Sequence, residues 1–244
     1  MVRYNLTYKP LGKAAILVEW PKKTSQEQLY DILGFVDNIE KSNIKVIIEL
    51  NFSYNSLLIS YENLKIDFFK LKHMLESVYA SIDGQIPRTF KKWKLPVCYE
   101  DEFAIDIDDL SMQIGLTKPT IIDVHSKSEY TVFFIGFLPG FLYLHGLPEQ
   151  LHFPRKSKPR SKVSKGAVGI GGDQTGIYPT TSPGGWHIIG NCPIELFRLN
   201  STKPCFAAPG DIIQFFPVSK NEHTQILSNS SSEKHILEWE VYHG

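Results

Sequence analysis

Six cationic side chains fall close together in one short segment, and no acidic residue lies between Glu149 and Asp173. They are Arg155, Lys156, Lys158, Arg160, Lys162 and Lys165. Arg155 and Arg160 each follow a proline, whose fixed φ stiffens the backbone that presents them. Because a guanidinium group offers planar, paired donors, the segment predicts a site for a carboxylate, phosphate or carbonate group. The alternative is a solvated face that docks acids from residues 100–109, such as Glu102 or Asp106.

Neutral hydrogen-bonding side chains follow directly, set among five glycines in GGDQTGIYPTTSPGGW, residues 171–186. This mixture suits the orientation of a small polar ligand, with backbone amides close by. The candidates are Gln174, Thr175, Tyr178, Thr181 and Ser182, with Asp173 as a candidate base and Phe137, Phe141, Tyr143 and Trp186 as possible walls. The alternatives are turn chemistry for the polar residues and core packing for the aromatic ones.

Residues 136–193 hold 11 of the 17 glycines and 7 of the 15 prolines. That density predicts tight turns and close backbone approaches that a side chain would block. It fits no nucleotide motif. A GxGxxG pattern that begins at Gly169 would need its third glycine at Gln174, and Ile177-Tyr178 stands where a phosphate-binding loop needs Lys-Ser/Thr. Ser182 lies outside a GxSxG context, so a nucleophile elbow is unsupported.

Metal binding finds little support either. His125 and Glu129 are four residues apart, but a strand expected from Tyr130 onwards makes that interval cross a turn. Three cysteines without a CxxC pair predict no cysteine-built zinc site and favour a reducing cytoplasm. We therefore expect no metal in this chain.

Charge and hydropathy exclude other classes of protein. Twenty-six basic residues balance 26 acidic ones, which argues against a nucleic-acid or anionic-membrane binder. No stretch approaches the roughly 18 apolar residues of a membrane span, and the first residues lack an apolar signal core. We expect a cytoplasmic globular protein of the α+β class.

The elements that must position these residues form two groups. Residues 1–87 predict the order strand, strand, helix, strand, strand, helix, which resembles a split βαβ, ferredoxin-like unit with an extra strand. Ser25 and Gln28 form a capping-box pattern for the first helix. The expected strands are 4–8, 14–20, 46–50 and 56–60; the second helix is Phe68–Ile82, and Asp83-Gly84 ends it. The basic piece 88–94 is expected to be a linker.

The second group is dominated by short strands between Gly and Pro turns, which favours a barrel or sandwich. The expected strands are 95–99, 121–125, 130–136, 167–171, 186–191, 212–217 and 239–243. A helix is expected over 108–115 and a short helical turn at 117–119. The polar segment 221–234 is expected to be a hairpin tip.

Several long motifs closely resemble the allophanate hydrolase subunit 1 family. They are HSKSEYTVFFIGF, GFLPGFLYLHGLP, PRKSKPRSKV and GDQTGIYPTTSPGGWHIIG, together with YKPLGKAAILVEW and YNSLLISYENLKI near the N-terminus. The family includes the 5-oxoprolinase B subunits, the KipI-type inhibitors of a sporulation kinase, and part of the carboxyltransferase region of urea carboxylases. The resemblance implies a ferredoxin-like α+β domain over residues 1–87 and a cyclophilin-like β-barrel over residues 88–244.

The resemblance also implies an activity that this chain shares with partners. As the B subunit of an ATP-dependent 5-oxoprolinase, the chain would help to open the lactam of 5-oxoproline (pyroglutamate) to glutamate. Its partners would be the A-like subunit of such an enzyme and its C-like subunit, which is an allophanate hydrolase subunit 2 protein, and the assembled complex would bind ATP. Two alternatives stay open: an inhibitor of a sensor histidine kinase, and a carboxyltransferase or allophanate hydrolase component of urea metabolism.

The family motifs place candidate substrate- or anion-binding residues on this sequence, while catalytic residues stay unassigned. The candidates are His125, Glu129, Arg155, Arg160, Gln174, Thr175, Tyr178, Ser182 and Trp186. Asn191-Cys192 replaces a pair that is often Arg-Thr in relatives, which weakens the expected grip on an anion at that corner. The chain carries no identifiable phosphate loop or base–nucleophile pair, so we expect no turnover without partners.

Overall fold

The computed structural model describes residues 4–22, 24–82, 88–230 and 238–243. The chain divides into two compact units, residues 1–88 and 89–244. None of the described helices is long and apolar enough to cross a membrane. The fold is mixed α+β, with a large mixed sheet in the second unit.

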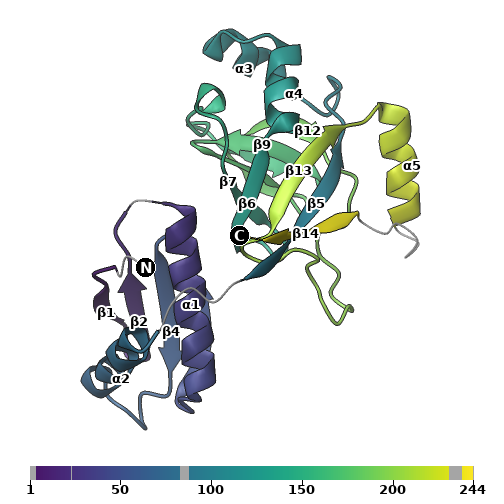
Figure 1. The fold of residues 1–244 in the computed structure, drawn as a ribbon. Coiled ribbons are helices and arrows are strands. Elements are labelled where there is room, and N and C mark those ends of the chain that lie inside the picture. The colour runs from purple at the N-terminus through teal and green to yellow at the C-terminus, as the bar shows by residue number, and fades with distance from the viewer. Residues whose placement is uncertain (1–3, 23, 83–87, 231–237, 244) are drawn as a thin grey trace. The chain divides into compact units, whose positions relative to one another are not determined.

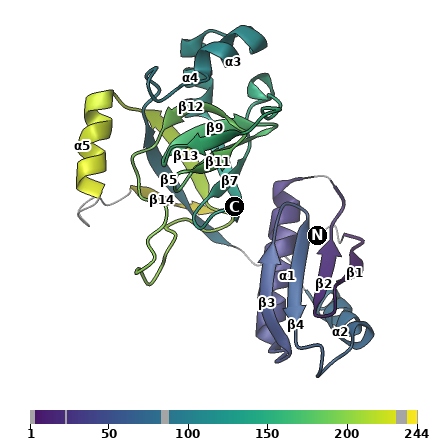
Figure 2. The same cartoon turned by 180° about the vertical axis from the view of Figure 1, so that it is seen from behind.

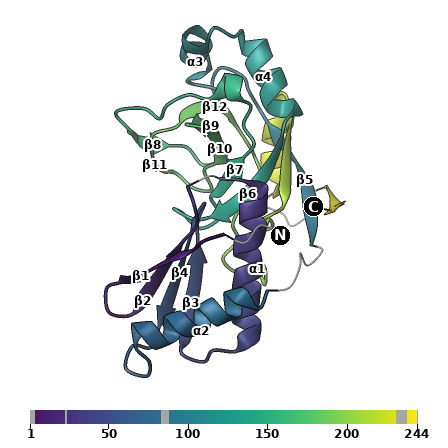
Figure 3. The same cartoon turned by 60° about the vertical axis from the view of Figure 1, so that its left-hand side comes forward.

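The N-terminal unit is a four-stranded antiparallel sheet covered on one face by two helices (Figures 1 and 3). The strand order is β1 (Thr7–Leu11), β2 (Ala15–Glu19), β4 (Ser56–Tyr61) and β3 (Ile47–Phe52). The helices are α1 (Gln26–Ser42) and α2 (Phe68–Ala80). This element order is the predicted one. The expected end of the second helix at Asp83-Gly84 lies outside the described residues.

Capping and alternation explain these elements. The Ser25 hydroxyl accepts the backbone N–H of Gln28 at 3.2 Å and starts α1, and Asn43 ends it in the left-handed region. Along β4 every second side chain is buried, so Leu57 and Ile59 face the helices. The unit's core combines that strand face with the apolar stripes of both helices.

The C-terminal unit is built on an eight-stranded sheet that curls round on itself (Figures 1 and 2). Its order is β12 (His187–Asn191), β9 (Ala167–Gly171), β10 (Gln174–Ile177), β7 (Leu142–His145), β6 (Glu129–Ile135), β13 (Ile212–Pro217), β5 (Thr89–Val97) and β14 (Trp239–His243). Cys98, directly after β5, exchanges two 2.9 Å backbone hydrogen bonds with Asn191 at the end of β12. The first strand of the sheet thus meets the extension of the seventh.

The remaining elements lie around this sheet. They are α3 (Ile107–Ile114), α4 (Lys118–Lys127), the short 3₁₀ helix Glu149–Leu151, the ribbon of β8 (Arg160–Val163) with β11 (Ser182–Gly184), and α5 (Lys220–Ser230). The core of the unit fills the inside of the curled sheet. Thr117 caps α4 through its hydroxyl, and the expected helical turn at 117–119 is its first turn.

Three sequence expectations are wrong in this unit. Residues 121–125, which were expected to be a strand, are helical in α4. Ile121 and His125 lie four residues apart on one buried face of that helix, whereas their β-branched neighbours favour a strand when the sequence is taken alone. The basic piece 88–94 is largely strand β5, in which Phe90 and Trp93 are buried.

The third error concerns the polar segment 221–234. Residues 220–230 form helix α5 rather than a hairpin tip, and the rest of the segment, 231–234, lies outside the described residues. The Ser219 N–H donates to the Glu222 carboxylate at 2.7 Å, while the Glu222 N–H donates to the Ser219 hydroxyl at 3.3 Å. This reciprocal capping box was the missed signal. His223 is buried and donates to Asn191 Oδ1 at 2.9 Å, which fixes the helix on the sheet.

Candidate functional site

Trp186 lies on a floor of glycines. A Cβ atom on Gly171 would stand 2.6 Å from Trp186 Cδ1, and one on Gly176 would stand 3.0 Å from Trp186 Cζ3. Gly169 approaches the same side chain, with 3.1 Å to Trp186 Cβ. The three glycines share one face of the β9–β10 ladder, so the expected close approach is that of an indole to the sheet.

Aromatic rings extend this floor into a continuous wall. Phe141, Tyr143 and Tyr178 surround Trp186, with ring centroids 5.5 Å (Phe141) and 5.9 Å (Tyr143) from it. Phe137 meets Phe141 edge-on and is 63% exposed, and its φ of 69° is left-handed. A bulky residue rarely adopts that conformation, and such strain is typical of functional sites.

Arg155 covers the wall. Its Cζ lies 5.4 Å from the Trp186 ring centroid, a cation–π arrangement, and the side chain is exposed. Burial raises the pKa of Tyr143 and the Arg155 charge partly opposes that shift, so the cation also acts on this second ring. No carboxylate of the described residues lies within ion-pair distance of Arg155. Its guanidinium therefore keeps its donors for a ligand.

The chain on both sides of Arg155 is tied down. Pro154 O and His187 Nε2 are 3.0 Å apart, and the Lys156 N–H donates to Gly185 O at 2.7 Å. Lys156 Nζ and both terminal nitrogens of Arg160 converge on the Asp106 carboxylate. Arg155 is thus presented by a segment that is fixed before and after it.

Asp106 is a buried acceptor with four donors. Arg160 approaches at 2.8 and 2.6 Å, Lys156 at 2.9 Å, and the Ile188 N–H donates at 2.7 Å. Burial pushes the pKa of Asp106 up, but the hydrogen bonds from Arg160, Ile188 and Lys156 outweigh it and the net pKa is lowered. For Arg160 and Lys156 the docking alternative of the sequence analysis holds. Lys165 pairs with Glu195 at 2.7 Å.

His125 and Thr175 lie inside the curled sheet, away from Arg155. His125 is fully buried between the Tyr99 hydroxyl, 2.8 Å from Nδ1, and the Thr175 hydroxyl, 3.0 Å from Nε2. Thr175 donates onward to Gly169 O at 3.0 Å. Burial lowers the pKa of His125 to about 3, so the imidazole is neutral. This hydrogen-bonded chain satisfies polar atoms of the core and offers no open position to a ligand.

The other predicted site residues are divided. Glu129 pairs with Lys92 at 2.7 Å and lies on β6, three strands from β9 in the sheet order. Tyr178 is buried, and a Cβ atom on Gly184 would overlap its hydroxyl. Ser182 is buried and donates to Pro183 O at 3.1 Å. Of the nine candidates, Arg155, Gln174, Tyr178 and Trp186 share the glycine-floored face.

Sequence reasoning passed over His145. The antiparallel register pairs Thr175 with Leu144, which sets Gln174 opposite His145 on the same face as Tyr143. The alternation in LYLH, residues 142–145, carried this signal, because it puts Tyr143 and His145 on one side. Among the described residues, no group of three or more His, Cys, Asp or Glu side chains could hold a metal ion.

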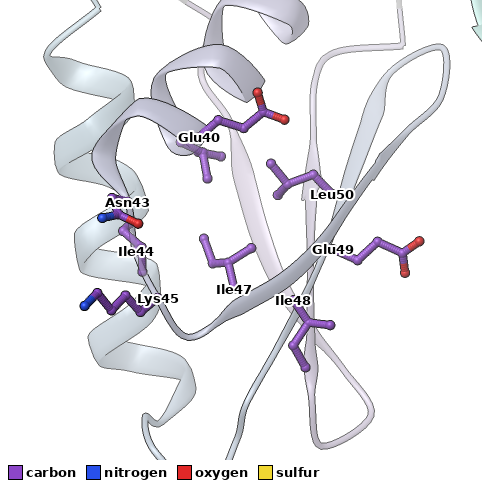
Figure 4. A pocket seen from close by; sticks show the side chains of 9 residues that line it. Glu40, Asn43, Ile44, Lys45, Ile47, Ile48, Glu49 and Leu50 are labelled. Atoms are coloured by element: carbon purple, nitrogen blue, oxygen red, sulfur yellow. The ribbon is translucent and has the colours of Figure 1, made fainter. Parts of the chain in front are cut away.

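A separate hollow of about 360 Å³ lies in the N-terminal unit, between the end of α1 and the edge strand β3 (Figure 4). A bulge between Ile47 and Glu49 turns Ile48 outward, and Ile48 is 66% exposed. Figure 4 shows Ile47 pointing into the hollow and the Glu49 carboxylate pointing away from it. The hollow contains none of the predicted site residues.

The family model for the carboxyltransferase domain, subdomains C and D, matches residues 6–207. The chain belongs to this family. It is 31% identical to the 5-oxoprolinase B subunit of Bacillus subtilis, over 91% of this chain and 96% of that protein. It is 36% identical to the 5-oxoprolinase B subunit of Haemophilus influenzae, over 84% of this chain and 95% of that protein. These relatives place the chain among the 5-oxoprolinase B subunits of the allophanate hydrolase subunit 1 family, as the motifs predicted.

A solved structure shows the same fold within a larger enzyme. The crystal structure of the K. lactis urea amidolyase superposes on 100% of this chain with a TM-score of 0.87, at 20% sequence identity. The chain spans 17% of that protein. At this identity the likeness concerns the fold alone.

Proposed function

We propose that this chain is the B subunit of an ATP-dependent 5-oxoprolinase that hydrolyses the lactam of 5-oxoproline to glutamate. The observation that carries the proposal is identity of 31–36% along 95–96% of the length of two 5-oxoprolinase B subunits. The urea amidolyase likeness is weaker in sequence and covers a small part of that enzyme. The family's other activities are therefore less well supported for this chain.

The glycine-floored face supports a binding role in that reaction. An unactivated lactam is a poor electrophile, and phosphorylation of its oxygen makes it reactive. Arg155 is an exposed cation over Trp186, fixed by its neighbours, and can hold the substrate carboxylate or a developing phosphoryl charge. The face presents no identified nucleophile with its base, so we propose that partner proteins complete the catalytic site.

ATP does not fit the glycine-rich stretch of this chain. The residues from Gly169 to Gly176 form a hairpin of two strands, in which Trp186 covers Gly169, Gly171 and Gly176, whereas a phosphate cradle needs exposed amides. We therefore propose that nucleotide binds elsewhere in the assembled complex. The proposed partners are the A-like subunit of a 5-oxoprolinase and its C-like subunit, an allophanate hydrolase subunit 2 protein, in an interface of more than about 1,000 Å².

We also infer finer identities for the two units and the compartment. The N-terminal sheet with two helices on one face supports a ferredoxin-like domain, and the curled eight-stranded sheet supports a cyclophilin-like barrel. The free thiols of Cys98 and Cys192 support a reducing cytoplasm.

The test is ATP-dependent release of glutamate from 5-oxoproline. The chain is assayed alone and after co-expression with the A-like and C-like subunits, with and without ATP. We expect glutamate only from the assembled complex with ATP. Turnover by the purified chain alone would contradict the shared site, and an assembled complex that forms no glutamate would contradict the proposed activity.

A further inference from the structure

Two polar atoms on the glycine-floored face are buried without a hydrogen-bond partner among the described residues. They are Nδ1 of His145 and Oε1 of Gln174. Buried polar atoms are nearly always satisfied in folded proteins, so an unsatisfied one calls for an explanation such as a missing ligand or water. Here two such atoms belong to side chains that are set opposite each other on adjacent strands, β7 and β10.

Both side chains can present these atoms to a ligand. Each residue is part-exposed, so both side chains lie near the surface of the sheet. The terminal torsions of His and Gln turn over a broad range at small cost, and a rotation brings Nδ1 or Oε1 outward. Neighbouring strands hold opposite residues about 5 Å apart, which is the spacing at which one small group can bridge two side chains.

The chemistry of the two atoms is complementary. The Gln174 Oε1 oxygen accepts a hydrogen bond, and it needs a donor such as an N–H group. Burial lowers the pKa of His145, with a smaller opposing effect of Asp173, so the imidazole is neutral. A neutral imidazole with its proton on Nδ1 donates to a carbonyl oxygen. A group that offers an N–H and a carbonyl oxygen along one edge would satisfy both atoms together.

We infer that His145 and Gln174 form a subsite for the cis edge of an amide, in which Gln174 accepts the amide N–H and His145 donates to the carbonyl oxygen. The inference rests on the proposed function, because the lactam of 5-oxoproline is such an edge. Trp186 connects the subsite to Arg155: its indole lies over Gly171, the ladder partner of Gln174, and the Arg155 guanidinium lies over the indole. The substrate carboxylate binds Arg155, and the lactam edge binds His145 and Gln174.

The experiment compares 5-oxoproline with N-methyl-5-oxoproline, which lacks the N–H, in the assembled complex. The variants are Gln174→Met and His145→Phe, and the matched control is Gln150→Met on the exposed 3₁₀ helix. We expect the unaltered complex to prefer 5-oxoproline in kcat/KM by about ten- to a hundred-fold. Gln174→Met should lose most of that preference, and Gln150→Met should keep it.

Thermal melting provides a second readout. Removal of a buried atom that serves only the structure should lower the melting temperature. Removal of a subsite atom that has no internal partner should leave the melting temperature unchanged or raise it. His145→Phe keeps the ring contact with Phe133, whose centroid lies 4.6 Å from that of His145, so its fold should persist while kcat/KM for 5-oxoproline falls at least ten-fold.

The outcomes separate the two proposals. A complex that makes glutamate, but whose Gln174→Met variant keeps the preference for the N–H substrate, overturns the amide subsite and leaves the proposed function standing. A wild-type complex that makes no glutamate contradicts the proposed function. In that case 2-pyrrolidinone and its N-methyl derivative are titrated into the complex, and equal binding of the two, as expected for a water-filled site, overturns the subsite as well.

Discussion

Arg160 binds the Asp106 carboxylate in a bidentate manner: Nη1 donates to Oδ2 at 2.8 Å and Nη2 donates to Oδ1 at 2.6 Å. The carboxylate side chain is only 4% exposed, so its charge depends on these donors. The pair fastens the segment that carries Arg155 to the start of α3. The ion pair thus holds together two segments that are 54 residues apart in the sequence.

Asp106→Asn should destabilise the fold by about 2–3 kcal/mol, because it weakens several charge-assisted hydrogen bonds in a buried position. Urea unfolding of the chain measures the change. The matched control is Asp108→Asn, whose carboxylate is 71% exposed and pairs with Lys118, and which should cost less than about 1 kcal/mol. Equal effects of the two substitutions would show that burial of the Asp106 pair contributes nothing.

The lowered pKa of Asp106 sets the sign of its pH dependence. A carboxylate whose pKa is lower in the folded state stabilises the fold above its unfolded value, and this stability is lost as pH falls through the folded value. The stability difference between the wild type and Asp106→Asn should therefore shrink on acidification. Unfolding free energies between neutral and strongly acidic pH test this, and a difference that grows toward acid would contradict it.

Arg155→Ala should lower kcat/KM of the assembled complex by about ten-fold to over a hundred-fold, because charge-assisted hydrogen bonds contribute roughly 1.5–3 kcal/mol. Arg155→Lys should also be impaired, since a point charge does not replace a planar fork. Melting should change little, because the side chain is exposed. Lys158→Ala, an exposed cation three residues on, is the control, and a similar loss in both variants would point to general charge instead of a specific contact.

Gly171→Ala should destabilise the fold by about 1–3 kcal/mol, because the new methyl group would overlap the Trp186 indole. Gly34→Ala is the contrasting change: that helical glycine has open space around its Cβ position, and alanine should stabilise α1 by up to about 1 kcal/mol. Thermal unfolding monitored by tryptophan fluorescence reports both. A neutral Gly171→Ala would mean that the indole does not rest on this strand.

His125 should make the fold acid-sensitive. Its pKa of about 3 lies below the ordinary value of 6.5, so the unfolded chain takes up a proton first as pH falls. Stability is fully present above pH 6.5 and decreases below it by up to about 1.4 kcal/mol per pH unit from this residue. The variant His125→Gln should show a slope shallower by that amount between about pH 6 and 4, and an unchanged slope would contradict the assignment.

The fold was predictable from sequence where local pattern and tertiary packing agree. Ser25 and Gln28 predicted the start of α1, and the apolar run in 56–60 predicted β4. The prediction failed where an element depends on contacts between residues that are distant in sequence. In the sheet Lys91 lies over the rings of Trp93 and Trp239. The sequence alone does not show this contact with Trp239, so the basic residues of β5 indicated a linker.

The candidate site divides in the same way. Residue types identified a polar, cation-rich segment, but neither spacing nor composition says which way a strand residue faces once the strand is in its sheet. Gln174 and Thr175 are neighbours that face opposite sides of the sheet. Gln174 lies on the glycine-floored face, and Thr175 is hydrogen-bonded to His125 inside the curled sheet. Likewise, the sequence offered acids that could dock Arg160, but only the fold selects Asp106.

The parallel pairing of β5 with β13 has a consequence for how the C-terminal unit forms. Residue 92 pairs with residue 212, and Cys98 meets Asn191, so the curled sheet closes through contacts of very large sequence separation. Closing such long loops costs chain entropy before the contacts repay it, which slows folding. During synthesis, β5 leaves the ribosome about 120 residues before β13. At ordinary elongation rates its apolar side chains therefore stay exposed to solvent for several seconds before β13 can pair with it. We expect this unit to depend on chaperones, or on prompt completion of the chain, more than the N-terminal unit does.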